Sequence, residues 1–170
     1  MNTDAGEQEA GNVATTPGRS FKLSLVVAMV VLILDQVTKT LAQRRLTDGT
    51  FDLFWTVRFN LTTNSGMAFS RGRGFGPIIG VLALAVIVAL LVTLRTEGSR
   101  LARVAVGAII GGAIGNVADR LFRSGGGFLR GEVIDFIDFQ WWPIFNVADI
   151  GVVLGGITLS LASLRHRAAA

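Results

Sequence analysis

Residues 101–120 read LARVAVGAIIGGAIGNVADR, a long apolar run that ends on polar side chains. The apolar part, residues 101–118, is close to the roughly 20 residues that a helix needs to cross a bilayer. Glycine recurs at every fourth position, at Gly107, Gly111 and Gly115, so these glycines share one helix face. Such a face lets a neighbouring helix approach closely. This stretch therefore predicts a membrane-spanning helix that packs against other helices.

Three other apolar segments have a similar length: residues 23–41, 76–94 and 144–164. Of the 170 residues, 51% are hydrophobic and 16% are charged, whereas about a quarter of a soluble domain is charged. The composition therefore predicts an all-α membrane fold with four transmembrane helices. Four spans put both ends of the chain on the same side of the membrane.

The two ends of the chain lack this apolar character. Residues 1–20 are polar and acidic, and they are expected to form a disordered tail. Residues 21–165 are expected to form a single polytopic membrane domain, followed by a short tail at residues 166–170. Basic residues flank the spans, which suits lipid headgroups better than nucleic acid. Their count is nearly balanced between the two sides, so it leaves the orientation open.

Two of the connections between spans are long and aromatic, at residues 42–75 and 119–143. They contain all three tryptophans, Trp55, Trp141 and Trp142. Tryptophan favours the membrane–water interface, so both connections are expected on one face of the membrane. Alternating β-branched and aromatic side chains at residues 51–69 predict a small β-subdomain on that surface, between the first two helices.

The absence of some residue types limits the chemistry. The chain has no cysteine, which excludes disulfides, cysteine nucleophiles and thiolate metal sites. Its one histidine, His166, lies in the C-terminal tail. A Ser-His-Asp triad and a histidine-ligated zinc site are therefore not expected.

Ionisable residues in apolar membrane helices cost free energy, and they tend to face a protein interior or a water-filled cavity. Asp35 and Lys39 lie one turn apart in the first span, and Asn146 and Asp149 lie at the start of the fourth. Asn116, Asp119 and Arg120 share one face at the end of the third. All of them are on the side of the aromatic connections. They can therefore converge in one site near one membrane surface.

Each of these groups also has a structural explanation. Asp35 and Lys39 could be a buried ion pair that fixes helix packing. Arg120 could extend to the interface from a helix end. Asn146 and Asp149 have the spacing of a helix cap, with an acid in the first turn. The residues by themselves leave these alternatives open, and Asp138 is expected to be an accessory or surface carboxylate.

Five motifs occur in order along the chain. They are Asp35-Gln36-Val37-Thr38-Lys39, Asn64-Ser65-Gly66-Met67-Ala68-Phe69, Gly111-Gly112-Ala113-Ile114-Gly115-Asn116-Val117-Ala118-Asp119-Arg120, Val133-Ile134-Asp135-Phe136 and Phe145-Asn146-Val147-Ala148-Asp149. In this order and within a frame of four spans, the chain resembles the lipoprotein signal peptidase (signal peptidase II) family over about residues 23–164.

The resemblance implies an aspartic endopeptidase whose catalytic pair is Asp135 and Asp149, with no metal and no cofactor. The implied substrate is a prolipoprotein that carries diacylglyceryl on a cysteine, and cleavage falls immediately before that cysteine. The implied location is the bacterial cytoplasmic (inner) membrane, with both termini cytoplasmic and the active site near the outer surface. The β-subdomain then corresponds to the family's extracytoplasmic β-cradle.

Further residues are implied to support the catalytic pair or to contact substrate. They are Asp35, Lys39, Asn64, Gly66, Ala68, Asn116, Asp119, Arg120, Asn146 and Ala148. The expected partners are prolipoproteins and membrane lipids, and a monomer is expected. The connection between the two aspartates is short, and Trp141-Trp142-Pro143 lies within it.

Other functions fit parts of the pattern. A proton-coupled transporter would also place Asp and Lys in the membrane, but it predicts internal repeats, which the two halves do not show. A Ser–Lys protease would need a neutral Lys39 as base and Ser65 or Ser70 as nucleophile. A carboxylate-bound metal enzyme would use Asp119, Asp135, Asp138 and Asp149. A structural membrane protein would tolerate the loss of Asp135.

Overall fold

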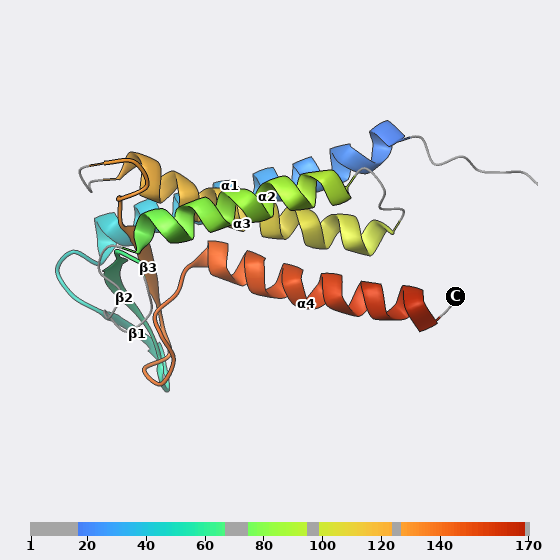
Figure 1. Ribbon diagram of the computed structural model, residues 1–170. Helices are drawn as coiled ribbons and strands as arrows, with labels where there is room; N and C mark the ends of the chain where they lie inside the picture. Colours follow the sequence, from blue (N-terminus) through green and yellow to red (C-terminus); the bar gives the residue numbers. More distant parts are fainter. Residues whose placement is uncertain (1–16, 67–74, 95–98, 124–126, 169–170) are drawn as a thin grey trace, which may run out of the picture.

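The computed structural model describes residues 17–66, 75–94, 99–123 and 127–168, which form a helical bundle with a small sheet at one end (Figure 1). The helices are α1 (Pro17–Arg45), α2 (Gly76–Thr93), α3 (Arg100–Phe122) and α4 (Val147–Ala168). The strands are β1 (Phe51–Phe54), β2 (Val57–Asn64) and β3 (Val133–Asp138). The sheet and the loops around it therefore cover the end of the bundle where the predicted site residues lie.

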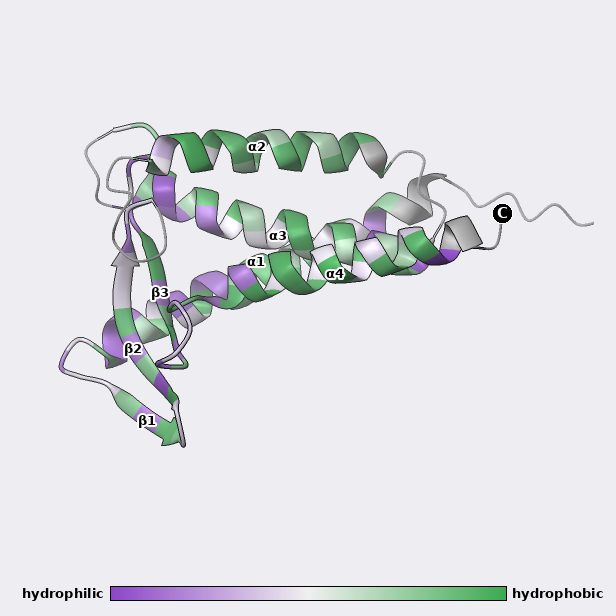
Figure 2. Cartoon of the chain, turned by 60° about the horizontal axis from the view of Figure 1, so that its bottom comes forward, coloured by the Kyte–Doolittle hydropathy of each residue, from purple (hydrophilic) through white to green (hydrophobic). Residues whose placement is uncertain are grey.

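Three helical segments in the described chain are long and apolar enough to cross a membrane: Phe21–Arg45, Arg100–Phe122 and Val147–Arg165. A shorter apolar helix covers Gly76–Val92. Hydrophobic residues predominate along the helices (Figure 2), and many of their side chains are at least half exposed, such as Val88 at 61%. An apolar outer surface of this size is suited to lipid rather than to water.

The helix boundaries differ from the predicted spans. The helix α1 already includes residues 17–20, so the predicted tail boundary at residue 20 is wrong; residues 1–16 lie outside the described residues. The helices α1 and α3 also continue past the predicted ends at residues 41 and 118. The reason is that hydropathy marks where apolar side chains stop, whereas helical hydrogen bonding continues through the polar turns that follow.

The helix α3 lies at the centre of the bundle, because its glycines admit both neighbours. A methyl group on Gly111 would collide with the backbone of Ala28 in α1. A methyl group on Gly112 would collide with the carbonyl of Ala148 in α4. The predicted close approach along the face of Gly107 and Gly111 is therefore present against α1, and Gly112, which is not part of that face, provides the approach to α4.

The three strands form one antiparallel sheet in the order β1-β2-β3. The predicted subdomain between the first two helices supplies only β1 and β2, because β3 comes from the segment after α3. Pairing with β2 sets Thr62 opposite Asp135. On the other face of β3, Ile134 and Phe136 are buried with Ala42 of α1. The third strand, which the sequence analysis did not predict, thus presents Asp135 to the end of the bundle.

Candidate active site

Asp135 in the middle of β3 and Asp149 in the first turn of α4 line the same cavity, which has a volume of about 400 Å³. Polar side chains at one part of the wall include Asn64, Asn116 and Arg120. The rest of the lining is apolar and comes mainly from α2, α3 and α4, with Val133 of β3 and Gly66 after β2. The cavity therefore combines a carboxylate pair with space for an apolar ligand.

The fully buried Asn146 connects the two aspartates. Its Nδ2 donates a hydrogen bond to Oδ1 of Asp135 at 2.6 Å. Its backbone N–H donates to Oδ2 of Asp149 at 3.1 Å, and its Oδ1 accepts from the backbone N–H of Asp149 at 3.0 Å. These last two bonds form a reciprocal capping arrangement at the start of α4. The cap that the spacing suggested is therefore present, and it holds both carboxylates.

Two further asparagines bind the remaining carboxylate oxygens. Asn116 donates from Nδ2 to Oδ1 of Asp149 at 2.8 Å. Asn64 donates from Nδ2 to Oδ2 of Asp135 at 3.3 Å, and its own Oδ1 accepts from the N–H of Gly66. Each aspartate is thus held from both oxygens by neutral donors. Such donors orient a carboxylate without adding a counter-charge to it.

The environment of Asp135 favours its protonated form. Burial, and to a smaller extent the neighbouring charge of Asp149, raise the pKa of Asp135 from 3.8 to about 7. Hydrogen bonds from Asn146 and Asn64 offset part of this increase in the pKa. A carboxyl group with a pKa of about 7 can hold a proton at neutral pH, as a general acid must.

A buried ion network lies behind the pair. The ammonium of Lys39 is 2.8 Å from Asp35 and 2.9 Å from Asp119, and these three side chains are at most 1% exposed. Lys39 also donates to Oδ1 of Asn116 at 2.9 Å. Since Asn116 in turn donates to Asp149, the network fixes one of the groups that orient this aspartate.

The two carboxylates of the network also hold the backbone next to each aspartate. Asp35 accepts from the N–H of Ala148 at 2.9 Å, one residue before Asp149. Asp119 accepts from the N–H of Ile134 at 3.2 Å, one residue before Asp135. The network therefore sets the positions of α4 and β3 relative to each other.

The other predicted residues have different positions. Arg120 is only 5% exposed, and its Nη1 has no hydrogen-bond partner among the described residues. Gly66 lines the cavity, whereas Ala68 lies outside the described residues. Asp138 is 3% exposed and 2.7 Å from Arg58, so a surface position for it is wrong. Strand pairing opposite Arg58 places it there.

Two residues of the network were missed by the sequence analysis. Gln36 donates to Asp35 and to Asp119. Arg123 donates to Asp119 at 2.7 Å and to Gln43 at 2.6 Å. The spacing of Arg123, four residues after Asp119, was a usable signal, because such residues are neighbours on a helix. Gln36 gave no comparable signal beyond its position next to Asp35.

The alternative sites do not assemble among the described residues. The four-aspartate metal site is divided, because Asp119 pairs with Lys39 and Arg123 while Asp138 pairs with Arg58. The hydrogen bonds and ion pairs of Lys39 are with Asp35, Asp119 and Asn116. These contacts favour an ammonium rather than the neutral base that a Ser–Lys protease needs.

Apolar helices of membrane-spanning length, with a pair of carboxylates on a partly apolar cavity, are typical of the class of membrane-embedded aspartic hydrolases. The family described as signal peptidase (SPase) II matches residues 27–165. The chain belongs to this family.

Proteins of two mycobacterial species illustrate the similarity. The lipoprotein signal peptidase of Mycolicibacterium smegmatis is 45% identical over 150 residues, which cover 87% of this chain. The alignment spans 63% of that relative's length, slightly less than two thirds. The lipoprotein signal peptidase of Mycobacterium tuberculosis strain H37Rv is 41% identical over 163 residues, which cover 92% of this chain and 80% of the relative.

Two solved structures have the same fold, and both are described as bacterial membrane enzymes. One has a TM-score of 0.73 and 28% identity, and the match covers 85% of this chain and 88% of that chain. The other has a TM-score of 0.71 and 27% identity, and the match covers 84% and 93%. The agreement in fold therefore extends over most of both chains.

Proposed function

We propose that this chain is an aspartic endopeptidase of a bacterial membrane that removes the signal peptide from diacylglyceryl-modified prolipoproteins. Cleavage falls immediately before the lipidated cysteine, and Asp135 and Asp149 form the catalytic pair. The observation that carries the proposal is Asn146, which connects two carboxylates on a partly apolar cavity. Membership of the signal peptidase II family supports the reaction and the class of substrate.

The geometry suits a general acid–base mechanism. Two neighbouring carboxyl groups share one proton, because the repulsion between two negative charges at close range disfavours ionisation of both. Asp135, with its pKa raised to about 7, is assigned the proton. Asp149, the other member of the pair, accepts from Asn116 and from the N–H of Asn146 and is assigned the role of base.

The reaction then proceeds without a covalent intermediate. Asp149 takes a proton from a water molecule, whose oxygen attacks the scissile carbonyl carbon while Asp135 protonates the carbonyl oxygen. A proton passes from Asp149 to the amide nitrogen, the carbon–nitrogen bond breaks, and Asp135 recovers its proton. The products are a new carboxyl end on the signal peptide and a free amine on the lipidated cysteine.

The cavity wall suggests how substrate binds. The apolar side of the cavity includes Ile79 and Ala83 of α2, Ala113 of α3 and Val152 of α4, which suit acyl chains and apolar peptide side chains. Arg120 lines the same cavity, with an Nη1 that has no partner among the described residues, and is assigned to a substrate oxygen. Asn64 and Gly66 are assigned to contacts with the substrate backbone.

We assign four transmembrane helices to the protein, with α2 as the shortest, and place both termini in the cytoplasm. The strand β3, which carries Asp135, and the start of α4, which carries Asp149, lie at the same end of the bundle (Figure 1). This end is then at the outer surface of the cytoplasmic membrane. The sheet is assigned as the β-cradle that holds substrate, and the protein as a monomer. A lipid-anchored substrate would present its scissile bond at the headgroup level of this surface.

The test is cleavage of a diacylglyceryl-modified prolipoprotein by the purified protein in detergent that contains a chelator. Wild type is compared with Asp135→Asn and Asp149→Asn, and with Glu132→Gln as a control carboxylate outside the cavity. Wild type and the control are expected to cleave before the lipidated cysteine, and both Asn variants to fail while still folded. Near-normal turnover by either Asn variant would refute the catalytic pair, and a requirement for added metal would refute the mechanism.

A further inference from the structure

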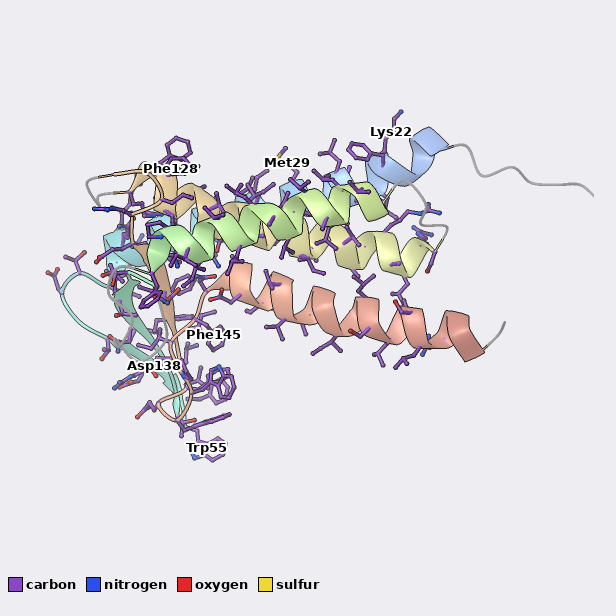
Figure 3. All side chains as sticks on the ribbon, viewed as in Figure 1. Lys22, Met29, Trp55, Phe128, Asp138 and Phe145 are labelled. Carbon is purple, nitrogen blue, oxygen red and sulfur yellow. The ribbon has the colours of Figure 1, made fainter. Side chains whose placement is uncertain are left out.

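A cluster of aromatic side chains lies outside the cavity, at the far end of the sheet. We call it the aromatic tip, and it consists of Phe54, Trp55, Phe139, Trp141 and Trp142. Trp55 is 93% exposed, Trp141 70% and Trp142 58%. These are the chain's three tryptophans. Figure 3 shows Trp55 at the end of the sheet, on the opposite side of the molecule from Phe128.

Two turns that are distant in sequence build the aromatic tip together. Gln140 donates from its side chain to the backbone carbonyl of Thr56 at 3.2 Å and so joins the β1–β2 turn to the segment after β3. The rings of Phe139 and Trp141 stack at 5.9 Å, and those of Trp141 and Trp142 meet edge to face at 6.1 Å. The rings of Phe139, Trp141 and Trp142 therefore pack on one another, while much of the surface of both tryptophans stays uncovered.

The turns hold bulky residues in an unusual conformation. Trp55 has a φ of +49° and Gln140 a φ of +67°, in the left-handed region that glycine favours. Trp55 is 93% exposed, so burial of its side chain inside the protein compensates for little of this conformational cost. Strain of this kind clusters at functional sites, so the outward position of the ring points to a role for it.

The aromatic tip is continuous with a surface that faces lipid. The helix α4 begins two residues after Phe145, and Val153 and Leu154 on its outer face are 56% and 57% exposed. In Figure 1 the sheet extends past α4, so a bilayer around the bundle would meet the tip beside this helix. Asp138 beneath the tip is paired with Arg58. The tip can therefore approach lipid without leaving this carboxylate unpaired.

Ring contacts connect the aromatic tip to the catalytic pair. Phe139 packs edge to face on Phe145 at 5.1 Å. Phe145 exchanges two backbone hydrogen bonds with Ile137, and the next residue, Asn146, bridges both aspartates. A displacement of the tip would therefore move Phe139, which packs on Phe145, and Phe145 is bonded directly to Asn146 in the chain.

We propose that the aromatic tip is a lipid anchor that inserts into the headgroup region of the bilayer beside α4 and holds the Phe145–Asn146 turn at a fixed depth. Tryptophan prefers this region because its ring is apolar and its N–H can still bind water or headgroup oxygens. The lipid anchor stands without any assumption on catalysis, whereas its effect on cleavage rests on the proposed function.

Intrinsic fluorescence tests the lipid anchor, because every tryptophan of the chain lies in the aromatic tip. The full chain is placed in phosphatidylcholine vesicles that carry bromine either near the glycerol end of the acyl chains or near their terminus. We expect stronger quenching by the shallow bromine than by the deep one, and weak quenching by aqueous iodide. Strong quenching by iodide, with no response to either brominated lipid, would overturn the proposal.

A pair of variants tests the connection to the site. Trp141→Ser combined with Trp142→Ser removes two of the five aromatics of the tip. Phe128→Ser removes an aromatic that is also 70% exposed, from the opposite side of the molecule. The double variant is expected to lose cleavage of lipidated substrate in vesicles and to keep it in detergent, while Phe128→Ser matches wild type in both. Equal losses in vesicles and detergent, with a raised KM, would mean that the tip binds substrate instead and would overturn the coupling.

These outcomes separate the lipid anchor from the catalytic proposal. If the bromine experiment fails while both Asn variants of the pair are inactive, the anchor is wrong and the peptidase assignment stands. If quenching occurs as expected but wild type does not cleave lipidated substrate, the anchor stands and the proposed function is wrong.

Discussion

Replacement of Lys39 by Met tests how far the buried ion network stabilises the fold. Lys39 and Asp35 are fully buried and 2.8 Å apart. Removal of one partner of a buried pair costs about 3–5 kcal/mol, because the other charge stays buried without compensation. Asp119, the second partner of Lys39, keeps Arg123 at 2.7 Å. The loss therefore falls mainly on Asp35, and we expect about 3 kcal/mol.

The double variant Asp35→Asn with Lys39→Met removes both charges of the pair. An asparagine at position 35 can still accept the hydrogen bond that the N–H of Ala148 donates at 2.9 Å. We expect the double variant to be more stable than Lys39→Met alone by about 2 kcal/mol, within the range of coupling between residues in contact. Stability is measured as the free energy of unfolding, from circular dichroism in mixed micelles with a rising fraction of denaturing detergent.

Turnover separates positioning from stability in the same variants. Lys39 holds Oδ1 of Asn116 at 2.9 Å, and Asn116 holds Asp149 at 2.8 Å. Both variants lose this restraint, so cleavage is expected to fall in both, although the double variant regains stability. A cost below about 1 kcal/mol for Lys39→Met would mean that the site is solvated, and would refute the assignment of a buried pair. Normal turnover in the folded double variant would refute positioning through Asn116.

Three further predictions follow from the same structure. Because the pKa of Asp135 is about 7 in the folded state and 3.8 ordinarily, the folded protein holds a proton that the unfolded chain releases. The free energy of unfolding should therefore fall as pH rises from about 4 to 7, and this fall should be missing in Asp135→Asn. Cleavage should decline above about pH 7. Gly112→Ala should disrupt the bundle, because its methyl group would collide with the carbonyl of Ala148, whereas Gly156→Ala has open space and should gain about 1 kcal/mol in thermal unfolding. Arg120→Met should raise KM more than it lowers kcat, and an unchanged KM in steady-state cleavage would contradict a substrate contact.

Much of the helical frame was predictable, because lipid requires long apolar helices and the sequence shows them directly. The sheet was predictable only in part. The strand β3 is six residues long and has Asp135 in its middle, so its pattern alone does not distinguish a strand from a loop. Its register comes from β2, a partner separated from it by the whole of α2 and α3. Local sequence does not carry that information.

The burial of charged residues was equally hard to predict. Asp138 looks like a surface carboxylate, and only its pairing with Arg58 across the sheet explains its 3% exposure. Arg123 likewise acquires its role from Asp119 and from Gln43 at the end of α1. In each case the partner lies on another element or one helical turn away. The motifs include Lys39 but leave out Arg58 and Arg123, which pair with Asp138 and Asp119.

The structural and catalytic explanations of Asn146 and Asp149 turn out not to be alternatives. A capping pair must keep its side-chain oxygens within hydrogen-bond distance of backbone N–H groups, which fixes both side chains. Catalysis also requires a carboxylate with a fixed orientation. The end of α4 meets both requirements with the same two residues, and Asn146 extends the cap to Asp135 with its Nδ2. A variant of Asn146 that breaks the cap therefore also removes a hydrogen bond from each aspartate of the proposed catalytic pair, so loss of activity at Asn146 alone identifies neither role.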